Sequence, residues 1–145
     1  MPLGIRAHDV PGRVSTGAYI LHAGVTKWSG SDEQATAVHR AAAGAFPFLK
    51  AVPPPRFLRV LAVAEMATGA LLLAPVPNRV AGLALTAFSG ALLTMYLRTP
   101  SLHKAGSFWP TPAGTAISKD IWMLGIGLGL IGRRSEAARR AQGAR

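Results

Sequence analysis

The sequence contains no cysteine and few acidic residues, since only 6 of its 145 residues are Asp or Glu. The lack of cysteine excludes disulfide bonds, thiolate zinc sites, iron–sulfur clusters and thiol relays. Charged residues of both signs make up 15% of the chain, against roughly 25% in an ordinary soluble protein. Because 50% of the residues are hydrophobic, intrinsic disorder over most of the chain is excluded. The length and composition predict a single, strongly apolar domain.

Basic residues are abundant: 16 Lys and Arg give a net charge of +10 and a pI of 11.6, which raises the question of nucleic-acid binding. Their distribution argues against it, because arginines cluster in residues 133–145 and most other cations flank apolar runs. The sequence also lacks zinc-finger spacing, a helix-turn-helix pattern and a basic-aromatic stripe. Cations that bracket apolar segments are typical of membrane proteins, where they contact lipid headgroups. We therefore expect membrane lipids, and no nucleic acid, as partners.

Four apolar segments predict membrane spans at residues 12–29, 57–76, 80–97 and 113–132. A transmembrane helix needs about 20 mainly apolar residues, and only 80–97 approaches this length without a charged residue. The alternative is a soluble four-helix domain, but its helices should carry a polar stripe that 80–97 hardly offers. The predicted fold is all-α: an integral membrane antiparallel four-helix bundle, formed as a single domain over residues 1–145.

The connections between these segments differ in length and composition. Prolines lie just before or after the segments, where helices tolerate them. The short link after residue 76 predicts an antiparallel hairpin of the second and third spans. The long link between the first two spans has apolar residues at helical spacing, which predicts an amphipathic interfacial helix over residues 32–48.

The orientation in the membrane depends on the basic residues. With both termini inside, Lys and Arg divide equally between the two sides, but the arginine cluster lies directly beside the last span. We therefore expect a multi-pass protein of the bacterial plasma membrane with both termini cytoplasmic and a basic cytoplasmic tail at 133–145. The first span is not followed by a small-x-small cleavage site, so we expect it to remain in the protein.

Three short motifs carry a resemblance to a known family. Residues 13–28 read RVSTGAYILHAGVTKW, residues 65–73 read EMATGALLL, and Ser118-Lys119-Asp120 opens the last span. Over about residues 10–132 the chain resembles the DoxX family of small four-helix bacterial membrane proteins. The resemblance implies an accessory or anchoring subunit of a membrane-associated redox complex, with redox proteins as partners and no established catalytic activity of its own. Relatives include subunits of a thiosulfate:quinone oxidoreductase and members of a membrane complex that protects against oxidants.

Glu65 is the acidic residue farthest inside an apolar span. At 1.5 Å per residue it lies roughly 12 Å below the end of the second span, and His22 lies at a similar depth in the first. An unpaired charge in hydrocarbon costs at least about 3 kcal/mol, so Glu65 should be paired, protonated or solvated. The candidate ligand-binding or ion-pair residues are Glu65, Lys27, His22, Arg59, Lys119 and Asp120.

Two hypotheses follow for this group of residues. The first is a polar pocket that binds a quinone headgroup, an anion or a proton, which would make the chain a small-molecule binder or carrier. The second is an internal ion pair that fixes helix packing in a purely structural membrane subunit.

Other features of the sequence favour structure over chemistry. We find no metal-ligand cluster, phosphate loop or nucleophile–base pair, so we expect no metal site and no catalytic residue; quinone is the one cofactor considered. Haem would need a second buried histidine, and Met66, Met95 and Met123 in apolar helices are more typical of packing. Small residues in the last two spans predict close helix packing, within the chain or in a homo-oligomer, at Gly82, Gly90, Gly125 and Gly129.

Overall fold

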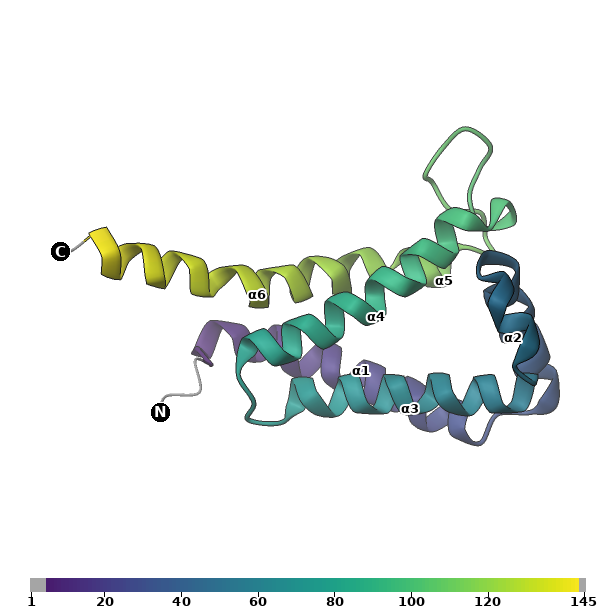
Figure 1. The fold of residues 1–145 in the computed structure, drawn as a ribbon, viewed down its shortest axis with the longest axis horizontal. Helices are drawn as coiled ribbons and strands as arrows, with labels where there is room; N and C mark the ends of the chain where they lie inside the picture. Colours follow the sequence, from purple (N-terminus) through teal and green to yellow (C-terminus); the bar gives the residue numbers. More distant parts are fainter. Residues whose placement is uncertain (1–4, 144–145) are drawn as a thin grey trace.

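In the computed structural model, which describes residues 5–143 and all their side chains except those of 133–141, the chain is helical (Figure 1). The α-helices are α1 (Val10–Trp28), α2 (Asp32–Ala45), α3 (Pro54–Leu73), α4 (Asn78–Arg98), α5 (Thr115–Ser118) and α6 (Asp120–Gly143). Short 3₁₀ helices cover Ala7–Asp9, Pro47–Ala51 and Pro100–Leu102. The described part of the chain has no strand, only an isolated antiparallel bridge between His103 and Pro110.

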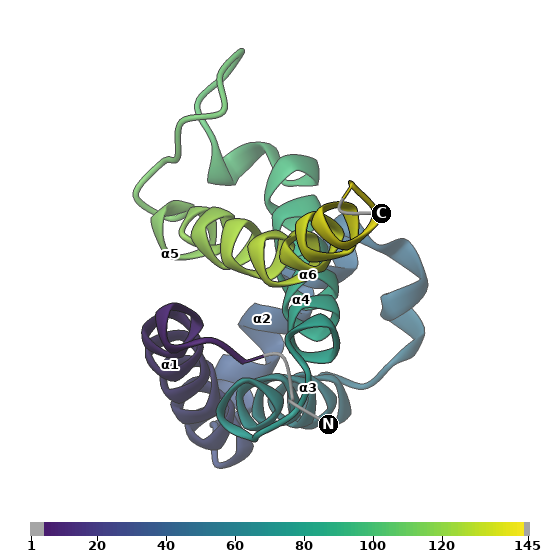
Figure 2. The same cartoon turned by 90° about the vertical axis from the view of Figure 1, so that its left-hand side faces the viewer.

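The long helices form two antiparallel pairs, α1 with α3 and α4 with α6. The end-on view in Figure 2 shows the pairs as two layers, with α1 and α3 below α4 and α6. The layers meet at the α3–α4 turn and diverge toward the other end, where α2 lies across them and contacts both α3 and α4 (Figure 1). We call the end with the α3–α4 turn the closed end and the end with α2 the bridged end.

Glycines bring the helix backbones together within each pair. A Cβ atom on Gly69 of α3 would lie 2.7 Å from the Gly17 carbonyl oxygen of α1, and one on Gly24 would lie 2.8 Å from the Ala62 carbonyl oxygen. Between α4 and α6, a Cβ on Gly82 would lie 2.8 Å from the Gly127 carbonyl oxygen. No larger residue fits these contacts without moving a backbone, so each pair is one tightly packed unit.

The glycines that make these contacts are only partly the ones expected. Gly82 packs as predicted, but a Cβ on Gly90, Gly125 or Gly129 would meet nothing within 4 Å. These three glycines therefore do not mediate the internal packing expected of them. On α6 the residue that faces α4 is Gly127. Gly125 and Gly129 are two positions away from it, and residues at that spacing point to a different face of a helix.

Two apolar clusters fill the space between the layers. The closed-end cluster contains Ile20, Leu72, Ala81, Leu85 and Leu130, with Val76, Phe88, Met123 and Ile126 packed against it. The bridged-end cluster contains Ala42, Ala45 and Met95, with Ala41, Phe46, Leu49, Phe57, Leu92 and Ile117 packed against it. The predicted helix over 32–48 thus exists as α2 and the 3₁₀ turn after it, and its alanine face covers the bridged end.

The helices agree with the four predicted segments to within a few residues at most ends. Two of them, Asn78–Arg98 and Thr115–Gly132, are long and apolar enough to cross a membrane by length and composition. The clearest difference is at the C-terminus, where α6 continues to Gly143 instead of giving way to a tail after residue 132.

The glycine contacts yield a first prediction. Replacing Gly69 by alanine forces its Cβ against the α1 backbone, and overpacking of this kind costs about 1–3 kcal/mol. We expect the Gly69→Ala variant to unfold several degrees below the wild type in thermal circular dichroism in detergent. Gly129→Ala is the matched control, because its Cβ enters open space and alanine favours helix; equal midpoints for the two variants would contradict this packing.

Candidate functional site

Lys27 and Glu65 form an ion pair between α1 and α3. The Lys27 Nζ atom lies 3.0 Å from Glu65 Oε1, and the two side chains are 22% and 8% exposed. The pair forms because Gly24, one turn before Lys27, lets α1 approach α3 closely at Ala62 and Met66, on either side of Glu65. The ion pair proposed from the sequence is confirmed, with Lys27 as the partner.

Asp120 is a second buried carboxylate close to this pair. It opens α6, is 8% exposed, and interacts electrostatically with both Glu65 and Lys27. Among the described side chains it forms neither an ion pair nor a hydrogen bond. The positive end of the α6 helix offsets part of its charge, but such an effect is typically 0.3–1 kcal/mol, less than a buried charge needs.

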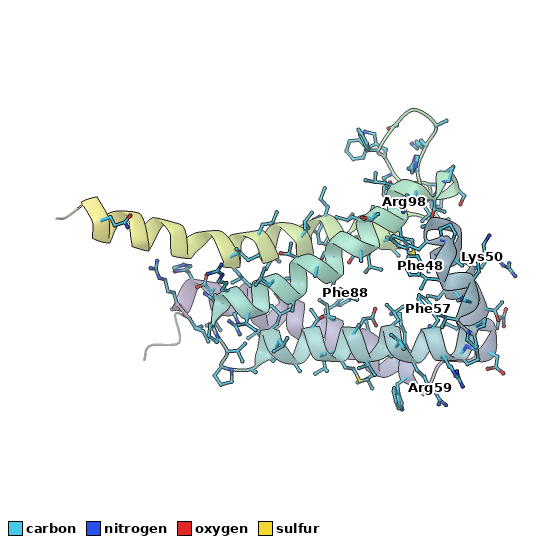
Figure 3. All side chains as sticks on the ribbon, viewed as in Figure 1. Phe48, Lys50, Phe57, Arg59, Phe88 and Arg98 are labelled. Atoms are coloured by element: carbon cyan, nitrogen blue, oxygen red, sulfur yellow. The ribbon has the colours of Figure 1, made fainter. Side chains whose placement is uncertain are left out.

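These residues lie between the two apolar clusters. Three polar residues, Glu65, Ser89 and Asp120, each lie in the sequence between one residue of the bridged-end cluster and one residue of the closed-end cluster. Glu65 lies between Phe57 and Leu72 on α3, Ser89 between Leu92 and Leu85 on α4, and Asp120 between Ile117 and Met123 on α5 and α6. We call Lys27, Glu65, Ser89 and Asp120 the polar layer. Figure 3 shows the region from the side, with Phe88 near the middle of α4 and Phe57 near the start of α3, both between these two helices.

Several polar atoms at this level have no partner. Glu65 Oε2, Ser89 Oγ and, one turn from Ser89, Thr86 Oγ1 are all buried without a hydrogen bond. Ser89 is 0% exposed. Leaving a buried polar group unsatisfied costs about 1–3 kcal/mol, and native proteins rarely tolerate it without a reason. Thr86 Oγ1 lies against Gly127 in the contact between α4 and α6. Glu65 Oε2 and Ser89 Oγ belong to the polar layer, which makes this layer the part of the described chain best suited to hold a ligand.

Three other residues predicted for the site are not part of it. His22 and Lys119 are exposed. Arg59 is also exposed, and its guanidinium lies 5.9 Å from the centre of the Trp28 ring, on the side of α3 that faces away from α4 (Figure 3). Position along a helix does not fix the direction in which a side chain points, and the sequence alone does not show that these three point outward.

Sequence reasoning missed the most extensively bonded side chain, Arg13. Its guanidinium uses all five N–H donors: Nε donates to the Leu72 carbonyl at 2.9 Å, and the two terminal nitrogens donate to Leu71, Ala74, Val76 and Asn78 Oδ1 at 2.7–3.1 Å. Asn78 Nδ2 in turn donates to Asp9 Oδ2 at 2.8 Å. Arg13 therefore caps the end of α3 and the α3–α4 turn. Because no donor is left over, this group is a structural clamp and not an anion site.

Signals for this clamp exist in the sequence but are weak. Arg13 precedes the first apolar run, and Asn78 follows a proline-rich turn that leaves several carbonyl groups without helical partners. Nothing in the spacing of residues 13 and 78 shows that they meet, so Arg13 was interpreted only as a charge that sets orientation.

An ordered loop extends from the bridged end between α4 and α5 (Figure 1). The Tyr96 hydroxyl donates to the Phe108 carbonyl at 2.7 Å, and the Lys104 amide donates to the Trp109 carbonyl at 2.9 Å. The side chains of Phe108 and Trp109 are nevertheless 83% and 74% exposed. Trp28, at the end of α1, is also exposed, as is typical of tryptophans at a membrane interface.

The described residues contain no group of three or more His, Cys, Asp or Glu that could hold a metal ion. Met95 and Met123 pack in the apolar clusters, as the sequence predicted for them. No protein-family model, no curated protein and no solved structure matches the chain.

The clamp generates a second prediction. Lysine has three donors in place of five and cannot reproduce the planar contacts, so Arg13→Lys leaves buried carbonyl groups unsatisfied. We expect a loss of about 2–4 kcal/mol in unfolding free energy, measured by denaturant titration in detergent. The matched control is Arg56→Lys, an exposed position at the start of α3, which should stay within 0.5 kcal/mol of wild type, roughly the range of surface changes. A wild-type unfolding curve for Arg13→Lys would show that the clamp contributes little.

Proposed function

We propose that this chain is a DoxX-like integral protein of the bacterial plasma membrane that crosses it four times and binds a small molecule in its polar layer. The observation that carries the proposal is the burial of Glu65 and Asp120, which interact with one lysine, together with the buried Glu65 Oε2 and Ser89 Oγ atoms that have no hydrogen-bond partner among the described residues. Each remaining feature of the proposal is supported separately.

The helix lengths and outer faces support four spans. Helices α1 and α3 have 19 and 20 residues, which at 1.5 Å per residue gives a length of about 30 Å, the thickness of a bilayer core. Large apolar side chains are exposed along the outside of all four long helices, including Tyr19, Val60, Leu83 and Leu128. A lipid environment would remove the cost of exposing this surface to water.

The chain directions support a common side for the two termini. The start of α1 and the end of α6 lie at the closed end (Figure 1). The exposed Trp28, which ends α1, and the exposed Trp109, in the loop between α4 and α5, lie at the bridged end. Four antiparallel crossings require this arrangement. The arginine-rich end of α6 favours the cytoplasm for the closed end, which makes the bridged end the outer one.

The polar layer is more consistent with binding than with packing alone. A purely structural ion pair would need one carboxylate for Lys27, whereas the layer holds two and leaves Glu65 Oε2 and Ser89 Oγ without partners. Quinone remains a candidate ligand: the Lys27 ammonium could donate to a quinone carbonyl, and a carboxylate could accept from a quinol hydroxyl. The resemblance to DoxX proteins supports placing the chain in a membrane redox complex as an accessory or anchoring subunit.

Mild-detergent purification followed by mass spectrometry of retained proteins, lipids and small molecules tests this function. We expect wild type to retain a small molecule and Glu65→Gln to lose it while remaining folded. Glu33→Gln, an exposed acid on α2, is the control and should retain what wild type retains. A stable wild-type monomer that carries neither ligand nor partner protein would contradict both the binding function and the subunit role.

A further inference from the structure

We propose that the ligand of the polar layer is a singly charged cation, either an alkali metal ion or a small ammonium compound, held by Glu65, Asp120 and the Ser89 hydroxyl. This inference rests on the proposed binding function and specifies the chemistry of its ligand. It differs from the expectation of a quinone or an anion at the same place.

The first argument is the charge of the layer. Glu65 and Asp120 bring two carboxylates, and Lys27 brings one ammonium group, which is already paired with Glu65. The described part of α4 contributes no charge at this level, since Arg98 lies at its far end and donates to the Ala45 carbonyl at 3.3 Å. His39 of α2 forms a hydrogen bond with the Leu49 carbonyl. The other cations of the neighbouring elements, Arg40, Arg59 and Lys119, are exposed and do not compensate the charge of the layer. With both carboxylates ionised, the interior therefore carries one more negative than positive charge.

The second argument is the cost of that excess charge. Charges in an apolar interior are stable when they are paired and hydrogen-bonded, and an unpaired one costs several kcal/mol. An anion would face two carboxylates across a medium that screens them poorly, so its binding is opposed. A cation removes the imbalance directly.

The third argument is the chemistry of the unpartnered atoms. Ser89 is fully buried on the stripe of α4 that includes Leu85 and Leu92, and its Oγ has no partner. Hydroxyl and carboxylate oxygens are the ligands that hard cations prefer. Because the described residues hold no group of three or more His, Cys, Asp or Glu, this set of oxygen ligands does not suit a transition metal or a tightly held divalent ion.

Thermal unfolding of the purified protein in mild detergent tests the inference. Sodium chloride, potassium chloride or methylammonium chloride is added in increasing amounts in place of N-methylglucamine chloride, so that the ionic strength stays constant. N-methylglucamine is the large reference cation. We expect the midpoint of wild type to rise saturably, by several degrees, with at least one of the three small cations, because a ligand that binds only the folded state stabilises it. Which cation acts distinguishes a metal ion site from an ammonium site.

Variants then locate the effect in the polar layer. Asp120→Asn should weaken the apparent affinity at least tenfold, and Ser89→Ala should weaken it severalfold while leaving the charge and the fold intact. Glu33→Gln, the exposed control, should titrate as wild type. No difference between the small cations and N-methylglucamine, or equal affinities in wild type and Ser89→Ala, would overturn the inference. If a quinone stabilises the protein and the cations do not, the binding function stands and the cation is excluded.

Discussion

The clamp made by Arg13 is the interaction on which the arrangement of the two layers depends. It joins the first turn of α1 to the last carbonyls of α3 and to Asn78 at the start of α4, so three helices are fixed at one point. Arg13 is 3% exposed, and burial of a guanidinium is tolerated because every donor is used, several in short charge-assisted bonds. With the closed end held this way, the layers can diverge toward α2 without separating.

The divergence explains why a polar layer exists at all. Within each pair, glycines bring backbone against backbone, but between the pairs only side chains fill the space. Apolar side chains do so at both ends, and Glu65, Ser89 and Asp120 occupy the level between them. A ligand at this level would bridge the two pairs and would be shielded from the ends of the helices by the two clusters. Among the described residues no close glycine-to-backbone contact joins one pair to the other, so the pairs are joined at this level by side chains alone.

Much of the fold, and part of the site, could be predicted from the sequence. Apolar runs and prolines located the long helices, and the spacing of alanines located α2, because these signals are local. The Lys27–Glu65 pair could also be predicted, because a buried carboxylate requires a partner. The Arg13 clamp and the packing glycines depend on which residues of different helices face each other, and no local pattern of the sequence encodes that. For the same reason the sequence did not show that His22 and Arg59 point away from the site.

Single-cysteine labelling tests most directly the claim that four helices cross the membrane and enclose the polar layer. The chain contains no cysteine, so Gly44→Cys, Ala105→Cys and Gln142→Cys each give one exposed label site in an unlabelled background. In intact spheroplasts, a membrane-impermeant maleimide should label residues 44 and 105, and residue 142 should react only after permeabilisation. Labelling of all three residues from the same side would contradict the four-span account and would leave the polar layer outside the bilayer.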